Sequence, residues 1–125
     1  MSGPLIFKIM TPAEWTAFER AGRFDGAPID KTDGFIHFSS PDQVEETAAK
    51  HFQDAGDLVL VAVDAAPLGD ALKWEPSRGG ALFPHLYGAL TLSAVRWHTP
   101  LRSLAGGGHD FPDGWRTQTG PEGDR

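Results

Sequence analysis

Two short stretches of the sequence carry the side chains best suited to chemistry. The first runs from Gly34 to Ser40 and contains one histidine, followed by two hydroxyls. The second runs from Phe83 to Gly88 and places a histidine and a tyrosine two residues apart, so that both lie on one face if the segment is extended. Imidazole titrates near neutral pH and can hold or move a proton. His37 and His85 are therefore the candidate acid and base.

Carboxylate and hydroxyl groups complete the candidate site. Glu75 ends a short strand expected over residues 72–75, where its carboxylate can stabilise positive charge in a transition state. Two serines follow His37 at an expected strand-to-helix joint, where hydroxyls and free helix N–H groups can hold a polar or anionic ligand. The predicted site has catalytic His37, His85 and Glu75 and ligand-binding Ser39, Ser40 and Tyr87.

The residues leave two other interpretations open. A metal-dependent enzyme would use His37, His85 and a carboxylate, a set acceptable to zinc or iron, but no HxH, HxxxH or HExxH spacing is present and we assign no metal ligands. In a structural interpretation, His37 satisfies buried backbone groups and Glu75 is a solvated strand end. A serine hydrolase is disfavoured because there is no GxSxG motif and Ser40 is better explained as a helix N-cap.

The strand and helix around His37 can be predicted from local pattern. Residues 34–38 are aromatic and β-branched and follow a polar, turn-forming run, which predicts a strand entered from a loop. The sequence Ser40-Pro41-Asp42-Gln43 has an N-cap hydroxyl, a proline at the first helical position and a glutamine that closes a capping box. It predicts a helix from Ser40 to a C-cap at Gly56, with His51 as a surface histidine.

Other segments supply the scaffold. A first strand is expected over 5–10, then a helix capped by Thr11 with Trp15 and Phe18 buried, and a surface loop over 23–33. The uninterrupted apolar run 58–63 predicts a central strand covered on both faces, and a last strand is expected over 90–101. We therefore predict an α+β domain with a mixed or antiparallel sheet of about five or six strands and two main helices.

Length and composition bound the function classes. The 125 residues suit one domain, which we place at 1–104, and residues 105–125 form a Gly- and Asp-rich tail that is either disordered or packed through Phe111 and Trp115. A net charge of −6 without a basic stripe argues against nonspecific nucleic-acid binding. The absence of cysteine excludes thiol chemistry. No segment has the length of a membrane span, so we expect a cytoplasmic protein.

The chain resembles a bacterial family, the domain of unknown function 952. The similarity extends from about Ile6 to Val95 and includes Trp15 in the first helix. Its two histidine motifs, Asp33-Gly34-Phe35-Ile36-His37-Phe38-Ser39 and Phe83-Pro84-His85-Leu86-Tyr87-Gly88, are specific, and the match also includes Leu72-Lys73-Trp74-Glu75.

The segment Phe35-Ile36-His37-Phe38-Ser39 also resembles the His-bearing strand of ADP-ribosyltransferase-like proteins, including the RNA 2′-phosphotransferases. That resemblance implies a split, mixed sheet with NAD in a cleft. It implies that His37 and Ser39 contact the nicotinamide-ribose side, that Tyr87 stacks or hydrogen-bonds, and that Glu75 or His85 takes the catalytic position. The arginine cluster of the phosphotransferases has no counterpart here, so RNA phosphate removal is not implied.

Together, the residues and the resemblances predict a small enzyme that acts on an NAD- or ADP-ribose-like ligand in a histidine-lined cleft. NAD is the candidate cofactor and a nucleotide-like small molecule the candidate partner. One alternative is a non-catalytic ligand-binding or interaction module that uses the same cleft. The other is the metal-dependent enzyme described above.

Overall fold

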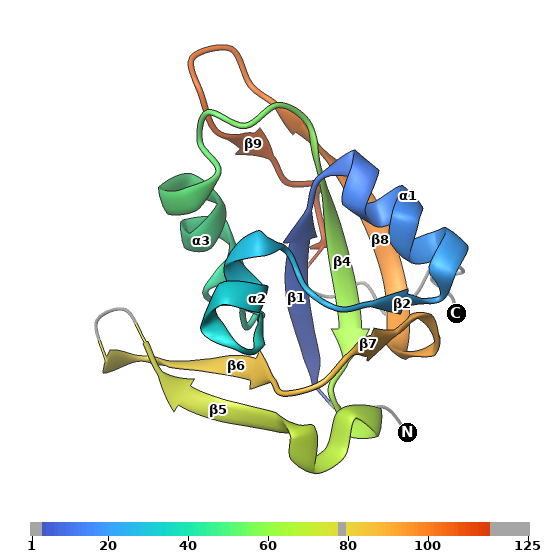
Figure 1. The fold of residues 1–125 in the computed structure, drawn as a ribbon. Helices are drawn as coiled ribbons and strands as arrows, with labels where there is room; N and C mark the ends of the chain where they lie inside the picture. Colours follow the sequence, from blue (N-terminus) through green and yellow to red (C-terminus); the bar gives the residue numbers. More distant parts are fainter. Residues whose placement is uncertain (1–3, 78–79, 116–125) are drawn as a thin grey trace.

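A four-stranded antiparallel sheet forms the centre of the computed structural model, which describes residues 4–77 and 80–115 (Figure 1). Its strands, in spatial order, are β1 (Leu5–Met10), β4 (Leu58–Asp64), β8 (Val95–Ser103) and β9 (His109–Asp110). Residues 58–63 of β4 are all buried, because β1 and β8 flank the strand and side chains cover both faces. The expected first strand and central strand are confirmed.

The first helix, α1 (Pro12–Ala21), is the one that the sequence predicts. The hydroxyl of Thr11 accepts the N–H of Glu14 at 3.1 Å, and the Glu14 carboxylate accepts the N–H of Thr11 at 2.9 Å. Both halves of the capping box are therefore present. Gly22 ends the helix in the left-handed region, with φ 74°. Trp15 and Phe18 are buried, as expected.

A second, three-stranded sheet has the order β3 (Ile36–His37), β6 (Leu82–Leu86), β5 (Leu72–Pro76). It joins the free edge of β1 through a backbone bridge in which Ser39 and Phe7 exchange two hydrogen bonds of 2.8 Å. Arg78 and Gly79, which follow β5 and precede β6 in the sequence, lie outside the described residues. The second sheet is thus held against the first at one edge.

The expectation of a surface loop over 23–33 is wrong. This segment contains β2 (Arg23–Phe24) and the short helix α2 (Pro28–Asp33). Proline occupies the first turn of α2, where its missing N–H costs nothing, and the Asp30 carboxylate accepts the N–H of Ala27 at 2.8 Å. These end contacts stabilise a helix too short to show apolar periodicity.

The helix expected to start at Ser40 starts later, as α3 (Val44–His51), and its C-cap is Phe52 instead of Gly56. The carboxamide oxygen of Gln43 does accept the N–H of Ser40 at 2.9 Å, as a capping box requires. Its Nε2, however, donates to the carbonyl of Leu82 at 2.7 Å. This contact with β6 holds residues 41–43 as a turn and delays the start of the helix.

The single strand expected over 90–101 is also wrong. The chain forms β7 (Leu90–Thr91), a 3₁₀ helix over Leu92–Ala94, and then β8. β7 pairs with β2, whereas β8 pairs with β4, so the chain has to turn between two sheets. A second 3₁₀ helix, Ala66–Ala71, connects β4 to β5.

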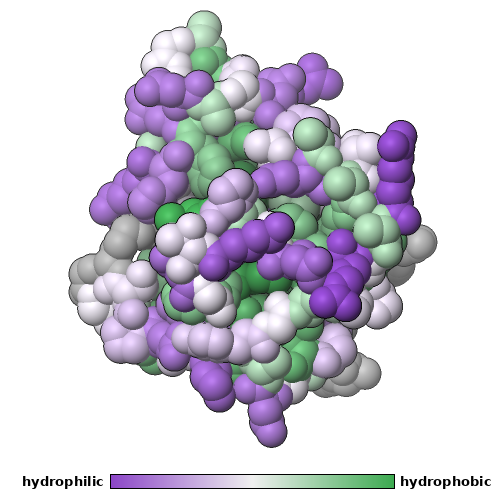
Figure 2. Space-filling model, viewed as in Figure 1, coloured by the Kyte–Doolittle hydropathy of each residue, from purple (hydrophilic) through white to green (hydrophobic). Residues whose placement is uncertain are grey.

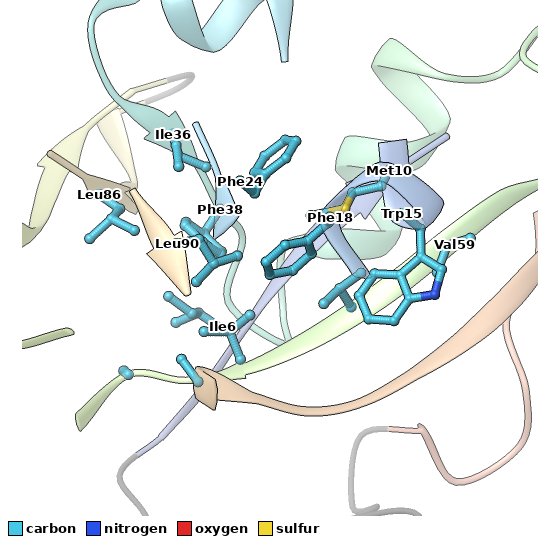
Figure 3. Close-up of a cluster of buried hydrophobic side chains, with 14 residues drawn as sticks. Ile6, Met10, Trp15, Phe18, Phe24, Ile36, Phe38, Val59, Leu86 and Leu90 are labelled. Atoms are coloured by element: carbon cyan, nitrogen blue, oxygen red, sulfur yellow. The ribbon is translucent and has the colours of Figure 1, made fainter. Parts of the chain in front are cut away.

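Two hydrophobic cores cover the two faces of the four-stranded sheet. The first contains Ile6, Phe18 and Val61 and extends to the second sheet through Ile36 and Leu86 (Figure 3). The second holds alternate residues of the same strands together with α3 and one residue of the C-terminal segment, namely Phe7, Ile9, Val44, Ala48, Leu58, Leu60, Ala62, Trp97, Leu101 and Trp115. Residues 116–125 of the expected tail lie outside the described part.

The architecture is a single α+β domain, as predicted, and every strand pair in the described part of the chain is antiparallel. No helix of that part is long and apolar enough to cross a membrane.

Candidate functional site

A cavity of about 490 Å³ lies where the edge of β1, the helices α2 and α3, and the second sheet meet. Its walls include four phenylalanines and nine polar or titratable side chains: Lys8, Asp30, Asp33, His37, Ser39, Thr47, His51, Ser77 and His85. Figure 2 shows hydrophobic surface between hydrophilic side chains on the face of the molecule that carries α2. The cavity has the size and the mixed lining of a small-molecule site.

Asp30 is the central anion in the wall of this cavity. Its side chain is 1% exposed and accepts two hydrogen bonds from Nζ of Lys8, at 2.9 and 3.1 Å. The same carboxylate accepts the backbone N–H groups of Ala27 and His37, at 2.8 and 3.1 Å. Nζ of Lys8 also donates to the carbonyl of His37 at 2.9 Å. The buried ion pair thus ties β1, α2 and β3 together.

His37 is held at both ring nitrogens. Nδ1 lies 2.6 Å from Asp30 Oδ1, and Nε2 lies 2.9 Å from Asp33 Oδ2. Ionised carboxylates only accept hydrogen bonds, so both contacts are satisfied when the ring is the doubly protonated imidazolium. The ring is one-third exposed and lines the cavity. His37 therefore presents a fixed, carboxylate-bound edge to the cavity.

His85 lies directly opposite His37 in the β3–β6 register, and the two ring centroids are 5.5 Å apart. Its Nδ1 lies 2.8 Å from Glu75 Oε1, and the same oxygen accepts the hydroxyl of Tyr87 at 2.8 Å. Phe35 stacks on the His85 ring with a centroid distance of 4.1 Å. His85 and Tyr87 therefore lie side by side at Glu75, although Tyr87 follows the end of β6.

The structure separates the six predicted site residues into two groups. His37, His85 and Ser39 line the cavity, and Oγ of Ser39 lies 3.0 Å from Oγ1 of Thr47. Ser40, Glu75 and Tyr87 do not line it. Ser40 is half-buried in the turn before α3, and the other two lie behind His85.

Sequence reasoning missed several members of the site. Lys8 and Asp30 escaped notice because their pairing joins a strand to a segment interpreted as a loop. Asp33 lies in the same segment. His51, predicted to be a surface histidine, is exposed and also lines the cavity. A signal existed for His51, since it follows Val44 and Ala48 at helical spacing.

The charges of the site perturb each other. Burial alone would raise the pKa of Asp30, but the His37 hydrogen bond and the Lys8 ammonium outweigh it and lower the pKa to about 2. Burial lowers the pKa of Lys8, against the opposing effect of Asp30. Hydrogen bonds from His85 and Tyr87 lower the pKa of Glu75, and the bond to Glu75 raises the pKa of Tyr87. Asp30 and Glu75 are therefore ionised at neutral pH.

Acid should weaken the fold through Asp30. Its pKa is about 2 in the folded protein against 3.8 for the ordinary side chain, so its stabilising contribution is complete above about pH 4 and is lost as the pH falls through about 2. The expected loss is about 2 kcal/mol. Urea unfolding between about pH 5 and pH 2 measures this loss of unfolding free energy. The Asp30→Asn variant should lack the part of the pH dependence that is due to Asp30. The exposed Asp25→Asn should keep the wild-type profile, and an unchanged profile in Asp30→Asn would contradict the assignment.

A metal site finds little support in this geometry. Within residues 4–77 and 80–115, no three His, Asp or Glu side chains are grouped so as to hold a metal ion. The carboxylates nearest the two central histidines already accept hydrogen bonds from ring nitrogens or from lysine.

The family model for "Protein of unknown function (DUF952)" matches residues 9–98, which include both histidine segments. The chain belongs to the DUF952 family. The membership that the motifs predicted is therefore confirmed, whereas no curated protein matches the chain.

Solved structures show that this DUF952 protein has relatives of the same fold. The crystal structure of protein CC0527 from Caulobacter crescentus is similar to it, with 52% sequence identity and a TM-score of 0.81, over 85% of this chain and 93% of that one. A solution NMR structure of CC0527 matches with 53% identity and a TM-score of 0.74, over 83% of this chain and 90% of that one.

Proposed function

We propose that this DUF952 protein is an enzyme that binds an NAD- or ADP-ribose-like ligand in the cavity between its four-stranded and three-stranded sheets. One observation carries the proposal: His37 and His85, opposite each other on β3 and β6, both line this cavity, and each has Nδ1 bound to a carboxylate. Carboxylate-held imidazoles in a partly enclosed cavity are a common arrangement for proton transfer and ligand orientation.

The walls of the cavity support a ligand with a flat ring and hydroxyl groups. Phe38, Phe52 and Phe83 contribute aromatic surface, and Ser39 contributes a hydroxyl beside His37. An aromatic ring can stack on such walls, while ribose hydroxyls can bond to imidazole and serine. The resemblance of the segment 35–39 to the His-bearing strand of ADP-ribosyltransferase-like proteins points to the same ligand class.

A second candidate function, ligand binding without catalysis, is favoured by the state of His37. Both of its ring nitrogens already contact carboxylates, so this residue has no free nitrogen for accepting a proton from a ligand. In that case the cavity would recognise the ligand and leave it unchanged. Binding and turnover therefore have to be measured separately.

The test is calorimetric titration of the purified protein with NAD, ADP-ribose and nicotinamide, followed by chromatography of NAD after incubation. We expect binding by wild type and loss of binding in His37→Ala, which removes the fixed edge of the site. At a ligand concentration of 100 times Kd, the free energy of unfolding should rise by about 2.7 kcal/mol. Release of nicotinamide from NAD would identify catalysis, and binding without release would identify the second candidate.

His98→Ala is the matched control, because His98 is exposed, packs against Trp15 in α1 and is absent from the cavity lining. It should bind like wild type. If none of the three ligands binds to a folded wild-type protein, the proposed function is wrong.

A further inference from the structure

We infer that His85 is the residue that transfers protons in this cavity, through Nε2, and that Glu75 and Tyr87 act as positioning residues behind it. The identity of the ligand in this inference rests on the proposed function, whereas the state of the His85 ring does not. The assignment differs from the one based on sequence, in which Glu75 itself faces the ligand.

The first step of the argument is the direction of the hydrogen bond between His85 and Glu75. Glu75 is ionised, so its Oε1 can only accept, and it accepts from both Nδ1 of His85 and the hydroxyl of Tyr87. The proton of a neutral His85 ring must then reside on Nδ1. The lone pair of the ring is left on Nε2, which is the form that a base requires.

The second step is the position of Nε2. Among the described residues, the only fully buried side-chain nitrogen or oxygen without a partner is Nδ1 of His109. Nε2 of His85 also has no hydrogen-bond partner among the described residues, but it is not one of the fully buried atoms. This nitrogen therefore keeps some exposed surface. The ring lines the cavity, whereas Glu75 and Tyr87, on the Nδ1 side, do not. Nε2 is thus the ring nitrogen available to a ligand.

The third step is the rigidity of the ring. The His85 side chain is only 6% exposed, and Phe35 stacks on it with an interplanar angle of 25°. Phe35 also contacts the rings of His37 and Tyr87, at centroid distances of 4.6 and 5.2 Å. A ring fixed by stacking on one face and by a carboxylate at Nδ1 keeps Nε2 in one orientation, as proton transfer requires.

The chemistry follows from this geometry. Nε2 takes a proton from a water molecule or a ligand hydroxyl in the cavity: the O–H bond breaks, an Nε2–H bond forms, and the electron pair remains on the oxygen. The imidazolium that results is stabilised by the Glu75 carboxylate at 2.8 Å. Return of the proton from Nε2 to a leaving group restores the neutral ring. His37, which is bound at both nitrogens, orients the ligand.

Nitrogen-15 NMR of the imidazole rings tests the assignment on wild type without any ligand. At a pH where the ring is neutral, we expect His85 to carry its proton on Nδ1. Glu75→Gln should weaken this preference, because a carboxamide can also donate a hydrogen bond to Nδ1. Tyr87→Phe, which keeps the acceptor, should leave the proton on Nδ1. His98→Gln is the control: it should remove only the signals of the His98 ring, which assigns them, and leave those of His85 unchanged. A wild-type His85 with its proton on Nε2 would overturn the inference.

Steady-state kinetics with NAD as the substrate supplies the second readout. We expect His85→Asn to lose about 100- to 10,000-fold in kcat with little change in KM, and Glu75→Gln to lose kcat in the same direction. Variants in which KM rises while kcat stays at the wild-type value would contradict a role in proton transfer. If NAD, ADP-ribose and nicotinamide all fail to bind, the proposed function is wrong. The position of the proton on the His85 ring, measured by NMR, still decides the inference. If NAD is turned over but the proton lies on Nε2, the inference alone fails.

Discussion

Replacing Asp30 with alanine is expected to lower the free energy of unfolding by about 3–5 kcal/mol, because the variant buries a lysine without its counter-ion. Lys8 and Asp30 are both nearly inaccessible, with side chains 8% and 1% exposed. The substitution also removes the acceptor for two backbone N–H groups, those of Ala27 and His37. Urea unfolding at neutral pH, monitored by tryptophan fluorescence, measures the change.

Two comparisons isolate the buried charge. Asp25 forms an exposed ion pair with Arg23 at 2.8 Å, and Asp25→Ala should cost about 1 kcal/mol or less. The double variant Lys8→Met/Asp30→Ala should be more stable than Asp30→Ala alone, since it leaves no uncompensated charge. An Asp30→Ala variant no less stable than Asp25→Ala would show that the pair contributes nothing to the fold.

Trp115→Ala is expected to cost about 3–5 kcal/mol, because it opens a large gap in the second core. Trp115 is 5% exposed and packs edge to face against Phe7, with a ring-centroid distance of 5.1 Å. Its ring centroid lies 5.4 Å from that of Phe111. Chemical denaturation, monitored by circular dichroism, gives the change in free energy. It also tests whether the stable unit extends beyond residue 104.

Leu104→Ala is the matched control in the same part of the chain. Leu104 is 49% exposed, so its truncation should change stability by less than about 0.5 kcal/mol. A Trp115→Ala variant that unfolds at the wild-type urea concentration would show that residues up to 104 form the stable domain by themselves, as the composition of the chain suggested.

Elements whose signals are local could be predicted from the sequence. The capping box of α1 involves residues three apart, and the apolar run of β4 needs only to be covered on both faces. Helix α2 was missed because its residues are those of a loop, and its stability depends on Asp30 contacts with distant partners. The late start of α3 was missed for a similar reason, since Gln43 binds Leu82 in another strand.

The candidate site could be predicted in its types of residue but not in its arrangement. His37 and His85 were expected to act together, and the β3–β6 register places them opposite each other. Which nitrogen of each ring is occupied depends on Asp30, Asp33 and Glu75, and those contacts form only in the tertiary structure. Spacing in the sequence could not reveal that Glu75 lies behind His85.

The Lys8–Asp30 ion pair in the wall of the cavity also has a consequence for folding kinetics. Nζ of Lys8 contacts Asp30 and His37, which are 22 and 29 residues away along the chain. Contacts between distant residues form slowly, because the loss of loop entropy precedes the gain in binding energy. Helix α1 and the β5–β6 hairpin, whose contacts are local, can form earlier. Refolding followed by stopped flow should therefore bring β1, α2 and β3 together later than α1 or the β5–β6 hairpin forms.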